Sequence, residues 1–157
     1  MDAHHDLIAL CTFNAAYADA IDGDALESWP GFFTEGCHYR ITHAENHREG
    51  LPAGIVYADS RAMLEDRVAA LREANIYERH RYRHLLGMPW ITARNPAAIE
   101  ARTPFMVARI MATGQTELFA TGAYHDRFVR EGGRLLLAER VAVCDSTVID
   151  TLLALPL

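Results

Sequence analysis

Residues 103–145 read TPFMVARIMATGQTELFATGAYHDRFVREGGRLLLAERVAVCD, and this stretch decides the fold class. Three long segments in it are rich in the β-branched and aromatic residues that favour strands: 103–112, 116–130 and 135–145. Gly114-Gln115 and Gly132-Gly133 separate these segments with residues typical of tight turns. Gly122, inside the middle segment, predicts a bulge that bends the sheet. We therefore predict consecutive antiparallel strands that curl.

The part of the chain before this stretch changes from helical to strand periodicity. Apolar residues recur at helical spacing over residues 7–21 and over a short segment bearing Leu26, Trp29, Phe32 and Phe33. A third helix is predicted from Asp59-Ser60, with Leu64, Val68 and Leu71 on one stripe that ends at Asn75. Residues 38–42 predict a first strand, residues 43–59 a long loop, and residues 77–92 a strand that ends before Asn95-Pro96. The fold class is therefore α+β, with three N-terminal helices packed on a strongly curved, mostly antiparallel sheet. We expect a single domain over residues 1–157.

Composition excludes several classes of function. The formal net charge is -6, so the field of the protein repels polyanions and we expect no nucleic-acid partner. All 15 cationic side chains are Arg, and the three cysteines are far apart, which favours buried free thiols. The N-terminus lacks a signal-peptide pattern, and no apolar run approaches the roughly 20 residues of a membrane helix. We expect a cytoplasmic chain without a membrane partner.

Residues 77–86, YERHRYRHLL, carry a row of arginines. On a strand, Arg79, Arg81 and Arg83 would share one face, with His80, Tyr82 and His84 on the other. Such a row can form a partner surface, because guanidinium groups pair carboxylates across an interface. It can equally be an internal ladder paired with Asp and Glu of a neighbouring strand. The candidate partner interface comprises Arg79, Arg81, Arg83, His84 and Asp145.

The sequence contains no convincing catalytic or metal motif. His80 and His84 would lie about 13 Å apart on a strand, too far for one shared ion. The paired Cys-x-His and Cys-x-x-His segments of a Rieske cluster are missing, as are a nucleophile elbow and a phosphate loop. Acid-base residues of a pocket remain conceivable: Tyr39, His84, Tyr124, His125 and Asp126 could line the hollow of a curved sheet. An isolated His or Tyr in such a place is more often a hydrogen-bonded core residue.

The apolar tail, residues 146–157, predicts a lid or an interface.

Several segments together resemble a known family. They are WPGFFTE at residues 29–35, CHY at 37–39, LEDRVAAL at 64–71, RYRHL at 81–85 and ERVAVCDS at 139–146. Taken in order, they resemble the small subunits of bacterial aromatic-ring-hydroxylating dioxygenases, which belong to the nuclear-transport-factor-like superfamily of cone-shaped α+β domains. Gly36 stands where Asp is commoner in the family. Residues 25–39, 71–84 and 144–157 are most similar to small subunits of terephthalate dioxygenases.

The resemblance implies a structural, non-catalytic subunit without a cofactor of its own. Three large and three small subunits would form a hexamer, in which this chain also contacts other copies of itself. Each large subunit would hold a [2Fe-2S] Rieske cluster and a mononuclear iron, supplied with electrons from NAD(P)H through a separate reductase. The reaction would convert an aromatic carboxylate, such as terephthalate, into a cis-dihydrodiol. The same cone also hosts stand-alone isomerases, dehydratases and cyclases, and a ligand-binding module without chemistry is a further alternative.

Overall fold

The computed structural model describes residues 2–51, 54–74, 79–146 and 155–157. In chain order the elements are α1 (Ala3–Asp22), the 3-10 helix η1 (Leu26–Phe32), β1 (Phe33–His43), α2 (Ala44–Arg48), β2 (Val56–Ala58), α3 (Arg61–Glu73), β3 (His80–Leu86), β4 (Trp90–Arg94), β5 (Ala98–Met111), β6 (Thr116–Glu131) and β7 (Arg134–Cys144). The predictions for Asn75, for residues 77 and 78 and for residues 147–154 lie outside the described residues.

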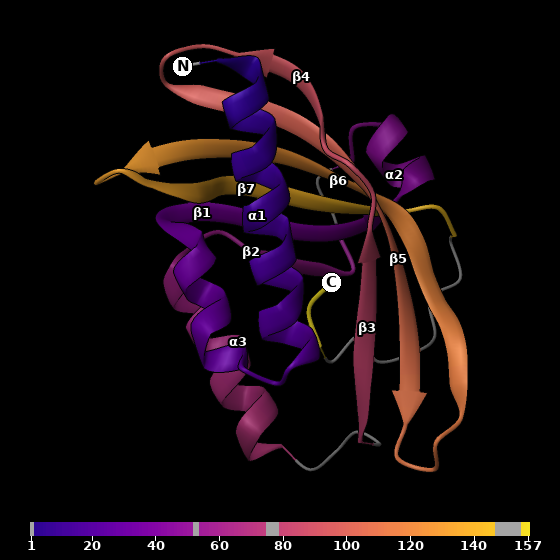
Figure 1. Cartoon of the computed structure of the whole chain (residues 1–157). Helices are drawn as coiled ribbons and strands as arrows, with labels where there is room; N and C mark the ends of the chain where they lie inside the picture. The colour runs from indigo at the N-terminus through magenta and orange to yellow at the C-terminus, as the bar shows by residue number, and fades with distance from the viewer. Residues whose placement is uncertain (1, 52–53, 75–78, 147–154) are drawn as a thin grey trace.

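The strands form one strongly curved seven-stranded sheet (Figure 1). Its order is β2-β1-β7-β6-β5-β3, with β4 also paired to β5. All pairings are antiparallel except that of β1 with β7. Helices α1 and α3 and the segment η1 lie over the concave face, and α2 lies on the other side of the sheet (Figure 1). The predicted α+β class, with N-terminal helices on a curved and mostly antiparallel sheet, is confirmed.

The concave face and the helices over it enclose an aromatic core. Tyr17, Trp29, Phe33 and Tyr39 are fully buried, with edge-to-face ring contacts at centroid distances of 5.2–6.2 Å. Buried aromatic pairs of this geometry stabilise a core beyond the area they remove from water. The short apolar segment around Trp29 therefore fills the space between the helices and the sheet.

Two of the register shifts in the sheet lie in the β5–β6 and β6–β7 pairings, where they bend the sheet, and neither falls at Gly122. One falls between Val107 and Ala108 of β5, the other between Arg127 and Phe128 of β6. The predicted bulge at Gly122 is wrong, because Gly122 pairs regularly on both sides. The glycine is needed for close approach instead: a Cβ there would lie 2.0 Å from the main-chain oxygen of Val143.

Several predicted boundaries also differ from the structure. The short helix that was predicted to include Phe33 is a 3-10 helix that ends at Phe32, and Phe33 begins β1. Pro30 lies inside this segment and has no N–H to donate to an i−4 carbonyl, which disfavours an α-helix there. The predicted loop over residues 43–59 contains α2 and the short strand β2. The predicted strand over residues 77–92 is interrupted between β3 and β4. At the interruption, Gly87 donates its N–H to the main-chain oxygen of Pro104 in β5. Pro104 has no N–H to donate in return, so the pairing with β5 breaks there. β5 begins at Ala98 rather than at residue 103.

Candidate functional site

The C-terminal end of the chain lies on the concave side of the sheet, and in Figure 1 it is seen between α1 and β3. Leu157 is fully buried, and Leu155 is 6% exposed. The main-chain oxygen of Leu157 accepts hydrogen bonds from the hydroxyls of Tyr17 at 2.9 Å and Tyr39 at 3.1 Å. The main-chain N–H of Leu157 donates to the Tyr39 hydroxyl at 3.0 Å. Tyr17 of α1 and Tyr39 of β1 thus bind the tail from inside the core.

A fully buried ion pair lies beside this site. Arg140 donates from Nε and Nη2 to the two carboxylate oxygens of Asp126, each at 2.8 Å, and from Nη2 to Oδ1 of Asn14 at 2.7 Å. Its guanidinium carbon lies 4.2 Å from the ring centroid of Tyr17 and 3.9 Å from that of Tyr124. Although burial alone would lower it, the neighbouring carboxylate raises the pKa of Arg140. Arg140 therefore stays charged inside the core.

The second register shift creates this pair. The turn pairs Glu131 with Arg134, and an unshifted ladder would place Asp126 opposite Glu139. The shift advances β7 by one residue, so Asp126 faces Arg140 instead. A like-charge contact is thereby replaced by a buried salt bridge.

A carboxylate from the end of α1 holds the edge strand β3. Asp22 accepts the main-chain N–H of His84 at 2.8 Å with one oxygen and lies 2.6 Å from His84 Nδ1 with the other. Both side chains are almost completely buried. Because the main-chain group belongs to the free edge of the sheet, Asp22 satisfies a donor that no strand could pair. The residue therefore fixes β3 against α1.

The predicted pocket residues are only partly brought together. Tyr39, His84, Tyr124 and Asp126 are buried toward the concave face. His125 points to the other face, where its ring centroid lies 4.6 Å from that of His47 on α2. Burial, and then the neighbouring cations, lower the pKa of His125 to about 4. The five residues therefore do not form one constellation.

The predicted alternation along β3 is present in the structure. Tyr82 and His84 are buried, whereas Arg81 and Arg83 are exposed. Arg83 of the arginine row forms a long ion pair: its Nη1 lies 4.0 Å from Oδ2 of Asp22. Arg79 and Arg81 line a cleft of about 790 Å³ beside α3, into which Leu155 also faces. These arginines are thus presented to solvent, while His84 from the same set is enclosed.

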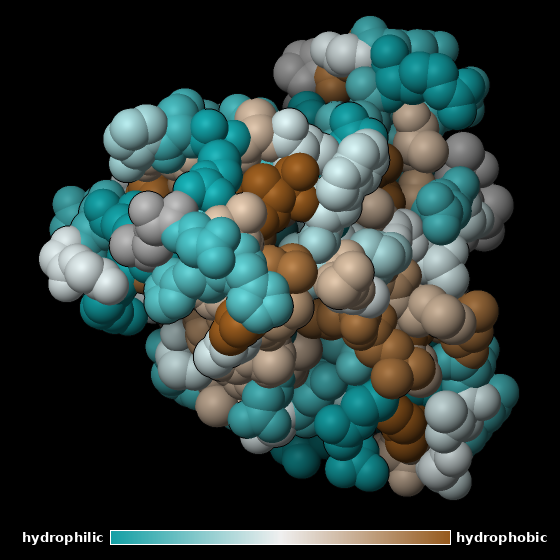
Figure 2. Space-filling model, turned by 45° about the horizontal axis from the view of Figure 1, so that its top comes forward, coloured by the Kyte–Doolittle hydropathy of each residue, from teal (hydrophilic) through white to brown (hydrophobic). Residues whose placement is uncertain are grey.

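Large apolar side chains are exposed next to the arginine row. They are Leu85 and Met88 in and after β3, Trp90 in β4, Met106 in β5 and Leu118 in β6. Leu85 pairs with Met106 and Met106 with Thr121, so these positions lie side by side across the sheet. Figure 2 shows the molecule from the side of Figure 1 with its top turned forward, and apolar side chains gather there too, from the centre of the view to its lower right. We call Leu85, Trp90, Met106 and Leu118 the convex apolar patch.

Asp145 lies at the end of β7, on the same cross-strand row as Leu85. It is exposed and accepts a hydrogen bond from the Thr121 hydroxyl at 2.9 Å. Because three inter-strand steps separate them, Asp145 and Leu85 are about 14 Å apart. Asp145 thus lies on the far side of the convex apolar patch from the arginine row.

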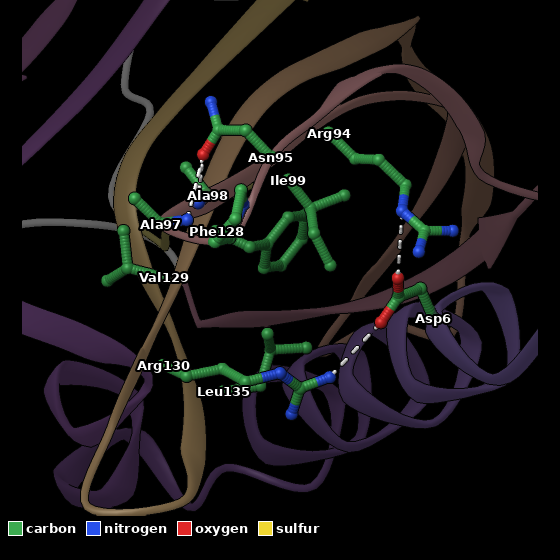
Figure 3. Close-up of a pocket in the computed structure, with 11 residues that line it drawn as sticks. Asp6, Arg94, Asn95, Ala97, Ala98, Ile99, Phe128, Val129, Arg130 and Leu135 are labelled. Carbon is green, nitrogen blue, oxygen red and sulfur yellow. Dashed lines mark hydrogen bonds and ion pairs between the residues drawn. The ribbon is translucent and has the colours of Figure 1, made fainter. Parts of the chain in front are cut away.

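A further pocket of about 510 Å³ lies at the other end of the sheet (Figure 3). Its floor includes Ile99 and Phe128. Asp6 of α1 is 4% exposed and contacts Arg94 at 3.5 Å and Arg130 at 3.3 Å. The carboxylate thus joins the start of α1 to β4 and to the end of β6. This arrangement ties three elements together, and it was not predicted from the sequence.

Metal clusters and membrane-spanning helices are both absent from the described residues. No cluster of three or more His, Cys, Asp or Glu side chains there is arranged to hold a metal ion. None of the described helices is long and apolar enough to cross a membrane. The expectation that the chain carries no cofactor stays a prediction.

Comparison with known proteins identifies the family. A family model described as ring hydroxylating beta subunit matches residues 16–151. The chain belongs to this family. The beta-subunit chain is 63% identical over 150 residues to the terephthalate 1,2-dioxygenase terminal oxygenase component subunit beta 1 of Comamonas sp, covering 96% of this chain and 97% of that one. It is 38% identical over 141 residues to the anthranilate 1,2-dioxygenase small subunit of Burkholderia cepacia, covering 90% and 88%.

A solved structure supports the same family. A chain from Novosphingobium aromaticivorans, described as the beta subunit of an aromatic-ring-hydroxylating dioxygenase, superposes with a TM-score of 0.91 at 40% identity. The match covers 99% of each chain. The predicted family membership of this beta subunit is therefore confirmed. The comparisons favour this family over the alternative of a stand-alone isomerase, dehydratase or cyclase.

Proposed function

We propose that this beta subunit is the small, non-catalytic subunit of a dioxygenase that oxidises terephthalate or a closely related aromatic carboxylate. The observation that carries its role as an assembly subunit is the convex apolar patch beside the arginine row. Contiguous apolar surface rimmed by charge is typical of protein interfaces. The substrate assignment rests on the 63% identity to a terephthalate dioxygenase subunit.

The arginine row and the patch have complementary roles in this proposal. Leu85, Trp90 and Met106 would lose water on assembly and supply apolar contact area. Arg79, Arg81 and Arg83 would form charge-assisted hydrogen bonds with carboxylates of the neighbouring subunit. His84 would act indirectly, because its bond to Asp22 fixes the strand that carries the arginines.

Asp145 would extend this surface at its opposite edge. It is exposed at the end of β7 and is held by Thr121. An acidic residue there and arginines across the patch give the interface opposite charges at its two sides, which favours one orientation of the partner.

The remaining parts of the proposal concern the assembly. Residues 1–157 act as one domain in a cytoplasmic hexamer of three large and three small subunits. The Rieske cluster and the mononuclear iron belong to the large subunit, and a separate reductase passes electrons from NAD(P)H. This chain contributes shape and contact surface to that complex.

Expression with and without the large subunit tests the proposal. The isolated chain is expected to be colourless and inactive, with iron below 0.1 equivalent per chain as an order-of-magnitude threshold set by its missing cluster ligands. The purified complex should be red-brown and should convert terephthalate to a cis-dihydrodiol, detected by liquid chromatography with mass spectrometry. Stoichiometric iron on the isolated chain, or turnover without the large subunit, would refute the non-catalytic role.

Substrate choice requires a separate comparison. With reductase present, terephthalate should be oxidised faster than benzoate or anthranilate by the same complex. Equal rates on all three acids, or preference for another acid, would reject the terephthalate assignment and leave the subunit role intact.

A further inference from the structure

The pocket in Figure 3 combines an apolar floor with charged walls. Ile99 and Phe128 are almost completely buried beneath it, and Leu135 is half-buried at its side. Arg94 and Arg130 line the same pocket. A cavity of about 510 Å³ with mainly apolar lining and a few polar groups is typical of sites for small organic molecules.

The charges that line this pocket do not balance. Among its described lining residues, Asp6 is the one carboxylate, whereas Arg94 and Arg130 are both cations. Asp6 is almost completely buried, and its charge compensates one of the two guanidinium groups. One positive charge therefore remains, on side chains whose exposed fractions are 38% and 34%. Such a charge, partly removed from water, attracts an anion more strongly than a fully exposed charge does.

The contacts within this cluster leave guanidinium donors for a second acid. Nη2 of Arg130 donates to Oδ1 of Asp6 at 3.3 Å, and Nε of Arg94 lies 3.5 Å from Oδ2. Arg140, by comparison, binds Asp126 through two nitrogens at 2.8 Å each, which is the strong, bidentate form of this interaction. The described contact of Arg130 with Asp6 uses a single N–H, so its guanidinium can still offer a pair of N–H groups to another carboxylate.

We propose that this pocket binds a small organic acid with one carboxylate and an apolar body, such as an aromatic ring. The carboxylate pairs with Arg94 and Arg130, and the apolar body lies over Ile99 and Leu135. Asp6 is a positioning residue, because its carboxylate lies between the two guanidinium groups and holds both at the pocket (Figure 3). The proposal goes beyond the role as an assembly subunit and does not depend on it.

The rim of the pocket is formed before a ligand binds. Oδ1 of Asn95 accepts the main-chain N–H groups of Ala97 at 2.8 Å and Ala98 at 2.9 Å, within the turn that joins β4 to β5. Asn95 and Ala97 are exposed, so the pocket can be reached from solvent at this rim. A site that is already ordered loses less conformational entropy when it binds a ligand.

Benzoate binding to the full-length chain tests the proposal, with its neutral isostere benzamide as the matched control ligand. In amide-detected NMR titrations, benzoate should shift the main-chain signals of Ala97, Ala98 and Arg130 and reach saturation. Benzamide should bind about tenfold more weakly, because it lacks the charge that pairs with the arginines. Acetate, which carries the charge without the apolar body, should also bind more weakly than benzoate.

Substitution of an arginine should remove this preference for the acid. Arg130→Gln leaves Asp6 and Arg94 to neutralise each other, so benzoate should weaken about tenfold while benzamide stays unchanged. The matched control is Arg127→Gln, which lowers the net charge of the chain by the same amount. Because Arg127 is exposed and does not line the pocket, this variant should bind both compounds as the natural chain does.

Three results would overturn the proposal. The first is the absence of benzoate-induced shifts at the pocket residues of the natural chain. The second is equal affinity of the natural chain for benzoate and benzamide, a comparison that decides the question even if Arg130→Gln does not fold. The third is equal weakening of benzoate by Arg130→Gln and Arg127→Gln, which would indicate an effect of overall charge rather than a site.

Discussion

Charged side chains have opposite environments on the two faces of the sheet: they are buried on the concave face and exposed on the convex face. On the concave face, Arg140 and Asp126 bind one another at 2.8 Å and are fully buried. On the convex face, Arg81 and Arg83 are exposed next to the convex apolar patch. The concave charges pair with each other inside the chain, whereas the convex arginines face solvent and are available to another molecule.

This difference separates charged residues that stabilise the fold from charged residues that can bind a partner. A charge buried inside a single chain must find its partner there, because an unpaired charge in the core destabilises the fold. An exposed arginine costs little in the free chain and can contribute to an interface. Substitutions on the two faces should therefore change different measurements: unfolding for the concave face and assembly for the convex face.

The largest effect is expected from Asp126→Ala. Removing this carboxylate leaves Arg140 charged and without its partner, which should lower the free energy of unfolding by about 3–5 kcal/mol in chemical denaturation. The apolar pair Asp126→Leu, Arg140→Met should recover most of that loss. As the control, Arg127→Ala on the exposed neighbouring position should stay within about 0.5 kcal/mol. Equal effects of Asp126→Ala and Arg127→Ala would show that the buried pair has no special weight.

The second effect concerns Arg81→Ala combined with Arg83→Ala. If these arginines pair partner carboxylates, the complex with the large subunit should weaken by about 2–5 kcal/mol, while unfolding of the isolated chain changes little. Pull-down yield and analytical ultracentrifugation measure the first quantity, and thermal unfolding measures the second. Arg134→Ala, at the exposed end of β7, is the control. Full assembly of the double variant would mean that the row does not contact a partner.

A smaller effect is expected from Asp22→Ala, which connects the two faces. It leaves the main-chain N–H and Nδ1 of His84 without their acceptor, at a cost of about 2–3 kcal/mol in unfolding free energy. Because Asp22 fixes β3, assembly should weaken as well. Asp19→Ala, exposed in the last turn of α1, should change neither quantity. If Asp22→Ala destabilises the chain but assembles normally, the strand does not need this carboxylate to present its arginines.

The strands of residues 103–145 were predictable because local signals agree there. Glycine turns separate the three segments of this stretch. In the earlier strand β3, alternation separates Arg81 and Arg83 from Tyr82 and His84. Local patterns also located the helices over the concave face. By contrast, the parallel pairing of β1 with β7 joins strands about a hundred residues apart, and nothing local encodes it.

Long-range contacts also explain the missed residues of the site. In the sequence, Asp22 belongs to an Asp-Gly-Asp segment that predicts only a turn. Its contact with His84 joins residues 62 positions apart, so no local pattern indicates it. Arg140 interrupts the otherwise apolar inward face of β7, and this pattern could have indicated a buried charge. Its partner, Asp126, could not be predicted, because the register shift beside Phe128 decides which residues face each other. The tail was predicted as a lid or interface from its composition, yet its acceptor role depends on two tyrosine hydroxyls 118 and 140 residues away.

The smallest effect is expected at His125, where α2 covers the convex face. Burial and the neighbouring His47 and Arg102 lower its pKa to about 4, below the ordinary value of 6.5. Between these values the unfolded chain binds more protons than the folded chain, so the stability from the neutral ring is full above about pH 6.5 and is lost as pH falls toward 4. His125→Gln should therefore flatten this part of the stability curve in urea unfolding, by a modest amount because the ring is partly exposed. His38→Gln, exposed on β1, should keep the natural slope; if both variants do so, the His47–His125 contact does not couple folding to pH.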